Sequence, residues 1–273
     1  MSRSHISPLD GLPVIDESPS DLIDGRHGGK GWEPRDFAAE PFGSMSLAVP
    51  LDIPLIPRDE WDERIKDMEA TKTRLTDLCD AAGLVVKNQQ MTNYCWINAP
   101  VHLLEVLRVA QGQEYVSLSP ASCGGPITNY ANARGNPAGV GGWGTKGLKY
   151  LAEKGAAPSH LWPDNTIDKR LDTAAANAER PKYRVTEWYD VQPGSFDAVM
   201  TCLLLRIPVA IGLSWWGHEV SAVDPVKLDG RGQYGATIDN SWGKQWGKNG
   251  RGVLTESRAT PNDAVAPRVV VAS

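Results

Sequence analysis

The chain changes character near Pro208, and this change constrains the fold more than any other feature. Before that residue apolar side chains recur mostly at helical spacing, as in residues 59–82, 145–154 and 196–205. After it, Gly, Asn and Asp turn signals separate four short strand-like stretches, which read PVAIGLSWW, EVSAVDPVKL, YGATIDNSW and GRGVLTES. The sequence therefore predicts an α+β protein with a helical first half and a strand-rich second half.

The N-terminal region differs from the body. Residues 1–57 are rich in Pro, Gly, Ser and Asp, which predicts an extended arm. Residues 58–83 are predicted to form a long amphipathic helix that Gly83 ends. Its apolar positions are Trp61, Ile65, Met68, Leu75 and Leu78. The remaining residues, 84–273, divide into a helical lobe over about 84–190, a strand lobe over about 191–257 and a C-terminal tail over 258–273.

Length and charge limit the class of protein. A chain of 273 residues is long enough for one large domain or for two lobes around a shared cleft. The formal net charge is -5 and the charges are mixed along the sequence, so we expect no nucleic-acid partner. The N-terminus has no continuous apolar segment, and no stretch reaches the roughly 18 apolar residues of a membrane span. We expect a soluble protein without a signal peptide or membrane contact, either cytoplasmic or part of a larger assembly.

The four cysteines lie far apart, without CxxC pairs or histidines at zinc-ligand spacing. We therefore expect no structural zinc and no cofactor. Cys79 and Cys202 lie on apolar helical faces, and we interpret them as small buried hydrophobes. Cys123, in the loop SPASCGGP, is interpreted as structural.

Cys95 is the candidate nucleophile, because it stands where a polar loop becomes an apolar helix. A helix N-terminus and a nearby imidazolium both lower the pKa of a thiol. Gln89, six positions earlier, is placed to hold an oxyanion together with the Cys95 backbone N–H. His218 is the candidate general base, and Asn240 on the next strand would fix its ring plane. Trp242 would cover that hydrogen bond, so the pattern predicts a thiol hydrolase.

These residues also carry a family resemblance. The stretch VKNQ, the six-residue step and the pair Cys95-Trp96 resemble the nucleophile segment of papain and the cathepsins. The stretches GHEV and NSWGKQWGKNG resemble the His and Asn segments of that family, and the second match is long and specific. Between them, LKYLAEKGAAPSHLWP and RIPVAIGL are also similar to the family. The resemblance covers about residues 84–257 and implies a papain-like cysteine peptidase.

The resemblance implies a two-lobed fold with the active-site cleft between the lobes. A helical left lobe would bear Cys95, and an antiparallel β-barrel-like right lobe would bear His218 and Asn240. Gly141 and Gly142 would pair with the substrate backbone, close to the pocket for the second residue before the scissile bond.

Four tryptophans belong to the same expectation. Trp96 and Trp242 occupy positions where the resemblance implies packing that supports the active site. Trp215 and Trp216, directly before His218, are candidates for lining the primed side of the cleft, with plain core packing as the alternative.

The sequence departs from the family in two turns and at the N-terminus. Residues 90–94 replace the usual glycine-rich, cysteine-containing turn, and residues 138–142 lack the usual cysteine, which fits a reducing compartment. Tyr94 is bulky beside the nucleophile. Family members commonly lose a helical prosegment, but only residues 83–86 separate the long helix from Lys87. We therefore expect the N-terminal region to be a permanent part of the protein.

Three functions stay open. The first is a cysteine peptidase acting on polypeptides through Cys95 and His218. The second is a structural or interaction protein, for example a component of a virus particle, that binds an assembly partner through residues 1–57. An occluded cleft would favour this second function. The third is another Cys-His chemistry, such as transglutaminase-like acyl transfer or peptidoglycan amide hydrolysis, for which an Asp or His would be expected where this chain has Asn240.

Overall fold

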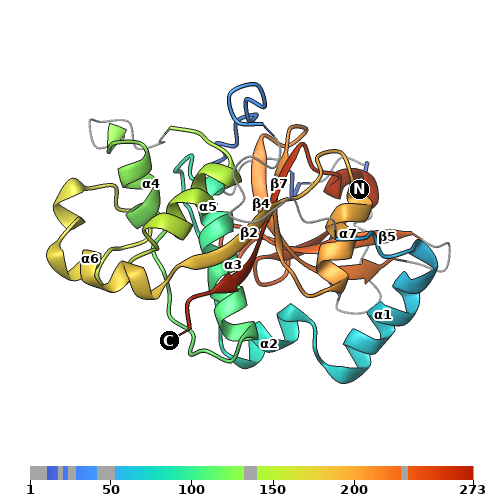
Figure 1. The fold of residues 1–273 in the computed structure, drawn as a ribbon. Helices are drawn as coiled ribbons and strands as arrows, with labels where there is room; N and C mark the ends of the chain where they lie inside the picture. The colour runs from blue at the N-terminus through green and yellow to red at the C-terminus, as the bar shows by residue number, and fades with distance from the viewer. Residues whose placement is uncertain are drawn as a thin grey trace.

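A computed structural model describes residues 11–17, 21–23, 29–41, 53–131, 140–228 and 233–272. Figure 1 shows α4, α5 and α6 gathered on one side, the strands and α7 on the other, and α3 between them. The helices are α1 (Arg58–Thr71), α2 (Leu75–Ala81), α3 (Cys95–Ala110), α4 (Ala121–Ile127), α5 (Gly144–Glu153), α6 (Ala174–Glu179), α7 (Phe196–Leu204) and α8 (Glu256–Ala259). The strands are β1 (Val14–Ile15), β2 (Val185–Asp190), β3 (Val209–Leu213), β4 (His218–Lys227), β5 (Tyr234–Asp239), β6 (Arg251–Thr255) and β7 (Asp263–Val270). The predicted α+β class and the order of its helical and strand-rich halves are confirmed.

The strands form one seven-stranded sheet in the order β1-β6-β5-β4-β3-β7-β2. All neighbouring pairs are antiparallel except β1 with β6. The sheet ends in β1 and β2, so it supports the expected barrel-like lobe only loosely. The expected C-terminal tail is wrong for residues 263–270, because they form β7 between β3 and β2.

The two faces of the sheet carry separate apolar cores. Along β3 successive side chains point to opposite faces. Val209 and Ile211 pack in the cluster that also contains Val199 of α7, whereas Ala210 packs in the cluster that contains Leu104 of α3. Fully burying a Val, Leu or Ile side chain contributes about 1.5–3 kcal/mol to the free energy of unfolding. The two cores therefore hold α7 and α3 against opposite faces of the sheet.

The predicted helix over residues 58–83 is wrong as a single helix. Lys72 has the left-handed φ of 55° and ends α1, and α2 begins only at Leu75. The buried Asp224 carboxylate of β4 accepts hydrogen bonds from the backbone N–H groups of Leu75 and Thr76, at 2.8 and 3.0 Å. A carboxylate satisfies the unpaired amides of a helix N-terminus, so this contact stabilises a second helix start.

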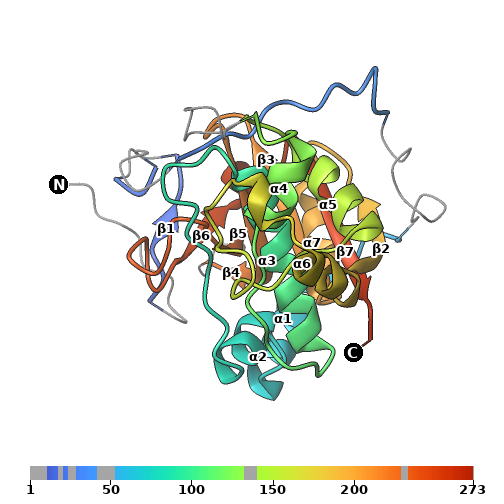
Figure 2. The same cartoon turned by 90° about the vertical axis from the view of Figure 1, so that its left-hand side faces the viewer.

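The described parts of the N-terminal arm run along the body. β1 adds a parallel strand at the edge of the sheet beside β6. In Figure 2 the blue chain continues from β1 across the top of the molecule. Within the described ranges, none of the helices has the length and apolar character that crossing a membrane requires.

Candidate active site

Cys95 is the first residue of α3 and is completely buried, with 0% of its surface exposed. Burial raises the pKa of its thiol, and the nearby Glu219 carboxylate adds to that rise. The backbone N–H groups of Glu219, Trp96 and Trp32 hydrogen-bond to the sulfur and partly offset the effect. The helix begins directly at Cys95 and contains Pro100 in its second turn.

His218 begins β4 and is also fully buried. Its Nε2 donates to Asn240 Oδ1 at 2.8 Å. Trp242 stacks on the imidazole, with ring centres 4.7 Å apart and planes 28° apart. Burial lowers the pKa of His218 to about 4, and the hydrogen bond to Asn240 opposes that shift only in part. The imidazole is therefore neutral in this arrangement at ordinary pH.

Residues from the two halves of the chain meet at Cys95, because the backbone next to His218 contacts its sulfur. The Cys95 sulfur meets the backbone N–H of Glu219, and Glu219 directly follows His218. Consecutive Cα atoms are about 3.8 Å apart, so the His218 backbone lies close to the Cys95 sulfur. Nδ1 of His218 is buried and has no hydrogen-bond partner among the described residues. It is the nitrogen left for proton exchange once Nε2 is bonded to Asn240.

Gln89 lies at the same site, but its amide is already in use. Its Nε2 donates to the carbonyl oxygens of Gly29 at 2.9 Å and Lys30 at 3.3 Å, and also to Thr92 at 2.7 Å. Ser241 Oγ donates to its Oε1, which fixes which end of the amide points at the arm. The predicted oxyanion donor thus contacts backbone carbonyls of the N-terminal arm.

The predicted substrate-backbone site, Gly141 and Gly142, is also occupied by the arm. The Gly142 N–H donates to the Gly31 carbonyl at 2.9 Å, and the Glu33 N–H donates to the Gly142 carbonyl at 2.8 Å. These bonds make Trp32 and Gly142 a parallel bridge pair. A Cβ on Gly141 would lie 2.4 Å from Glu33 Oε1, so the arm packs tightly there.

Residues 29–33, which we call the covering segment, need glycine to lie this close. Gly31 has φ of +126°, and a Cβ there would lie 2.2 Å from the Asn93 carbonyl oxygen. A Cβ on Gly29 would lie 2.1 Å from the Thr92 carbonyl oxygen. Only glycine permits this backbone approach without strain. Trp242 Nε1 also donates to the Gly29 carbonyl at 2.9 Å, so the residue expected to support the site also holds the arm.

The other predicted tryptophans take packing positions. Trp96 is fully buried, and its ring lies 2.7 Å from where a Cβ of Gly142 would be. Trp216 is 2% exposed and meets the His218 ring edge-on at 5.1 Å. Trp215 stacks on Trp216 at 5.2 Å and is only partly buried. Of the two candidates for the primed side, only Trp215 keeps exposed surface.

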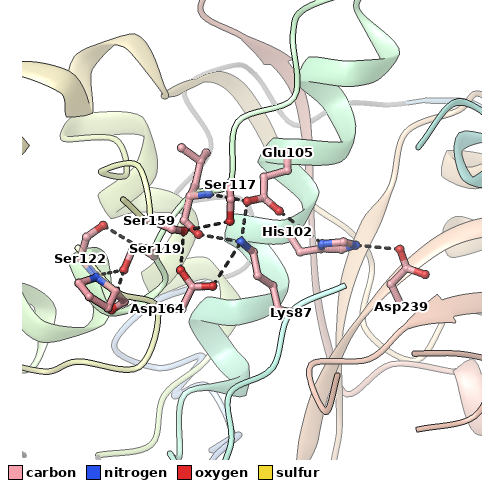
Figure 3. Close-up of polar contacts among 11 residues, drawn as sticks. Lys87, His102, Glu105, Ser117, Ser119, Ser122, Ser159, Asp164 and Asp239 are labelled. Atoms are coloured by element: carbon pink, nitrogen blue, oxygen red, sulfur yellow. Dashed lines mark hydrogen bonds and ion pairs between the residues drawn. The ribbon is translucent and has the colours of Figure 1, made fainter. Parts of the chain in front are cut away.

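A series of buried charged side chains lies beside the site. Figure 3 shows Lys87, Glu105, His102 and Asp239 in succession, with the middle two on α3. Lys87 Nζ lies 2.6 Å from Glu105 Oε1, and His102 Nε2 lies 2.7 Å from Asp239 Oδ2. Asp239 also pairs with Arg251 at 2.8 Å. These ion pairs therefore link α3, which carries Cys95, to β5, which leads to Asn240.

Sequence reasoning missed the covering segment and Glu219. The stretch GGKGW at residues 28–32 was a usable signal, since three glycines and a tryptophan stand out in an arm of short polar and proline-rich stretches. Glu219 gave no signal, because a carboxylate beside a histidine is ordinary on a surface strand. All four cysteines are free and buried, and the described residues contain no group of three or more His, Cys, Asp or Glu suited to a metal ion.

Comparison with solved structures identifies the fold. Procathepsin L 3 from the larval midgut of Tenebrio molitor is similar with a TM-score of 0.56 and 19% identity, over 68% of this chain and 66% of that chain. Xylellain, a cysteine protease from Xylella fastidiosa, is similar with a TM-score of 0.58 and 19% identity, over 88% of this chain and 96% of that one. A structure from work on the mite allergens Blo t 1 and Der p 1 gives 0.62 and 17% identity, over 96% and 87%. This chain spans just under two thirds of the procathepsin, and it has the papain-like cysteine protease fold.

No protein-family description and no curated protein matches the sequence.

Proposed function

We propose that the protein is a cysteine peptidase whose active site is covered by its own N-terminal arm. Once the arm leaves, His218 takes the Cys95 proton and the thiolate attacks a peptide carbonyl carbon. Gln89 and the Cys95 backbone N–H hold the oxyanion, and the imidazolium returns its proton to the departing amine. Water then hydrolyses the thioester, which releases the acid and restores the thiol.

One arrangement carries this proposal. The His218 imidazole is bonded through Nε2 to Asn240, is stacked on Trp242, and has its Nδ1 unbonded within the described residues, one residue from the N–H that meets the Cys95 sulfur. A thiol hydrolase requires an imidazole that an orienting group holds by one nitrogen, with the other nitrogen free to exchange a proton with the thiol.

The covering segment accounts for a resting state without activity. The arm presents the Trp32 N–H to the sulfur rather than a carbonyl carbon, so it offers no bond to attack. It also occupies the Gln89 amide that would hold an oxyanion. Burial under the arm raises the pKa of Cys95 and lowers the pKa of His218 to about 4, which disfavours the thiolate-imidazolium pair.

A second function is supported by the same coverage. A protein that keeps the fold for binding or assembly would also leave Cys95 at 0% exposure beneath a permanent arm. The two functions differ in what happens after the arm is displaced: a latent peptidase gains turnover, whereas a non-catalytic protein does not.

The test is covalent labelling of the full chain with a peptidyl epoxide or vinyl sulfone, followed by mass spectrometry of the modified residue. We compare the wild type, Gly31→Ala to displace the covering segment, and Gly31→Ala combined with Cys95→Ala. Cys123→Ala is the matched control, because Cys123 is also a fully buried thiol but lies on α4.

Labelling confined to Cys95, faster in Gly31→Ala and lost with Cys95→Ala, would support the peptidase. Casein turnover by Gly31→Ala would add to that support. Labelling that persists without Cys95 would refute the nucleophile. A displaced arm with neither labelling nor turnover would favour the non-catalytic function.

A further inference from the structure

Gly212, Glu219 and Asp263 lie side by side on three neighbouring strands and form an acidic position near Cys95. Gly212 of β3 pairs in register with Glu219 of β4 on one side and with Asp263 of β7 on the other. Residues directly opposite each other on neighbouring strands project from the same face of a sheet. The two carboxylates therefore flank a residue that has no side chain, and we call this position the Gly212 pocket.

The pocket faces α3 rather than α7. Ala210, two residues before Gly212 and on the same face, packs in the core that contains α3. Ser221, two residues after Glu219, donates from Oγ to the Ala99 carbonyl of α3. The Glu219 backbone N–H hydrogen-bonds to the Cys95 sulfur, so a residue of the pocket contacts the proposed nucleophile directly.

The covering segment fills the pocket with Trp32. A Cβ on Gly212 would lie 2.0 Å from Trp32 Nε1, so the indole occupies the space that a side chain would take. Trp32 is also the residue that pairs with Gly142. The backbone pairing and the side-chain position therefore belong to the same residue of the bound segment, as they would for a bound substrate.

The charges of the pocket are incompletely satisfied. Glu219 is 1% exposed, and the Gly144 backbone N–H lies near its carboxylate, but no cationic side chain in the described ranges of the chain pairs with it. Asp263 is 3% exposed, and the arm residue Arg35 lies 3.6 Å from its Oδ1. Burial, reinforced by the Asp263 charge, raises the pKa of Glu219. A buried carboxylate is costly unless a cation pairs with it, so the two carboxyls that flank Gly212 favour a positively charged side chain there.

We propose that the Gly212 pocket is the specificity pocket of the peptidase and that it selects substrates with an Arg or Lys side chain at the residue that pairs with Gly142. The glycine leaves room for a long side chain, and Glu219 and Asp263 receive its positive charge. While the arm is in place, the Trp32 indole fills the space over Gly212 and the Arg35 guanidinium pairs with Asp263. This proposal rests on the proposed peptidase function and adds its substrate class.

The test uses the full chain with Gly31→Ala and a set of matched fluorogenic peptides. The peptides differ only at the residue whose backbone would pair with Gly142, which is Arg, Leu or Phe. We expect kcat/KM for Arg to exceed that for Leu by about tenfold or more, the size expected for a hydrogen bond to a charged group. Glu219→Gln and Asp263→Asn should each reduce the Arg-to-Leu ratio by about tenfold. Glu153→Gln, an exposed carboxylate at the far end of α5, is the control and should leave the ratio unchanged.

The preference for Arg over Leu is measured a second time as the ratio of Cys95 labelling rates with Arg and Leu vinyl sulfones. This measurement needs no turnover. Efficient reaction with Leu or Phe peptides and no preference for Arg would overturn the pocket while leaving the peptidase intact. An Arg preference that survives Glu219→Gln would also overturn it. No reaction of Cys95 with any peptide reagent would overturn the peptidase and the pocket together.

Discussion

His102 Nε2 lies 2.7 Å from Asp239 Oδ2, and Asp239 is the residue directly before Asn240. His102 stands two helical turns after Cys95 on α3. The pair joins α3, which begins at Cys95, to β5, which leads to Asn240. Figure 3 shows the same histidine with Glu105 nearby, so both ring nitrogens face carboxylates.

We predict that His102→Gln destabilises the fold in a pH-dependent way. Burial opposes a charge on His102, but the bonds to Asp239 and Glu105 outweigh it and raise its pKa above 6.5. This stabilisation is complete below the ordinary pKa and is lost as pH rises through the raised one. At pH 6 the variant should lose about 3 kcal/mol of unfolding free energy, because a buried carboxylate loses one partner.

Urea unfolding between pH 5 and 10 checks this prediction. The gap between wild type and His102→Gln should narrow at alkaline pH. His160→Gln, at an exposed position, is the matched control and should show no gap. A gap that stays constant across the whole range would contradict a charged His102.

Gly31→Ala should expose the nucleophile. The new Cβ would lie 2.2 Å from the Asn93 carbonyl oxygen, at a φ that L-residues rarely adopt. The strain should weaken the covering segment and raise the rate of Cys95 labelling at least about tenfold, equivalent to about 1.4 kcal/mol. Ala39→Gly, an exposed change in the same arm, should leave the rate at the wild-type value. Equal rates in the two variants would show that the arm does not limit access.

The pH dependence of iodoacetamide labelling should differ between covered and uncovered forms. In the covered form burial raises the pKa of Cys95, and His218, with a pKa of about 4, is neutral above that pH. The wild-type rate should therefore keep rising to at least about pH 9. In Gly31→Ala the helix N-terminus and an accessible imidazolium should bring the plateau to lower pH. Superimposable profiles would argue against coverage as the cause.

Asn240→Ala should slow turnover by Gly31→Ala roughly 10- to 100-fold, because the imidazole loses the bond that fixes its ring plane. Asn240→Asp should retain more activity and raise the pKa of His218, which a shift in the pH-rate profile would report. Asn177→Ala, on α6 away from the site, serves as the control. Equal rates for Asn240→Ala and the control would remove Asn240 from the mechanism.

Local patterns predicted much of the fold. Residues 196–205 were expected to be helical, and Ser195, a preferred N-cap residue, accepts at its Oγ from the Ala198 N–H at 3.1 Å. The helix that begins at Cys95 and the strands after Pro208 follow from apolar spacing and turn residues that act within a few positions. The roles of Cys95, His218, Asn240 and Gln89 stay predictions, although the structure joins His218 to Asn240 and sets the residue after His218 against the Cys95 sulfur.

The errors share a different cause, because each depends on a partner far along the chain. The break before Leu75 is fixed by Asp224, which lies 149 positions later. β7 escaped notice because Pro267 interrupts an apolar run, and proline is rare in inner strands. The covering segment depends on Gly142 and Gln89, and no local pattern in the arm encodes contacts with them.

The inner position of β7 has a consequence for synthesis on the ribosome. β7 lies between β3 and β2 in the sheet. Neither of these two strands can pair with β7 until residues 263–270 have emerged from the exit tunnel. Until then both strands present unpaired backbone edges, which are prone to aggregation during translation. Chaperone capture of nascent chains should therefore persist until β7 has emerged.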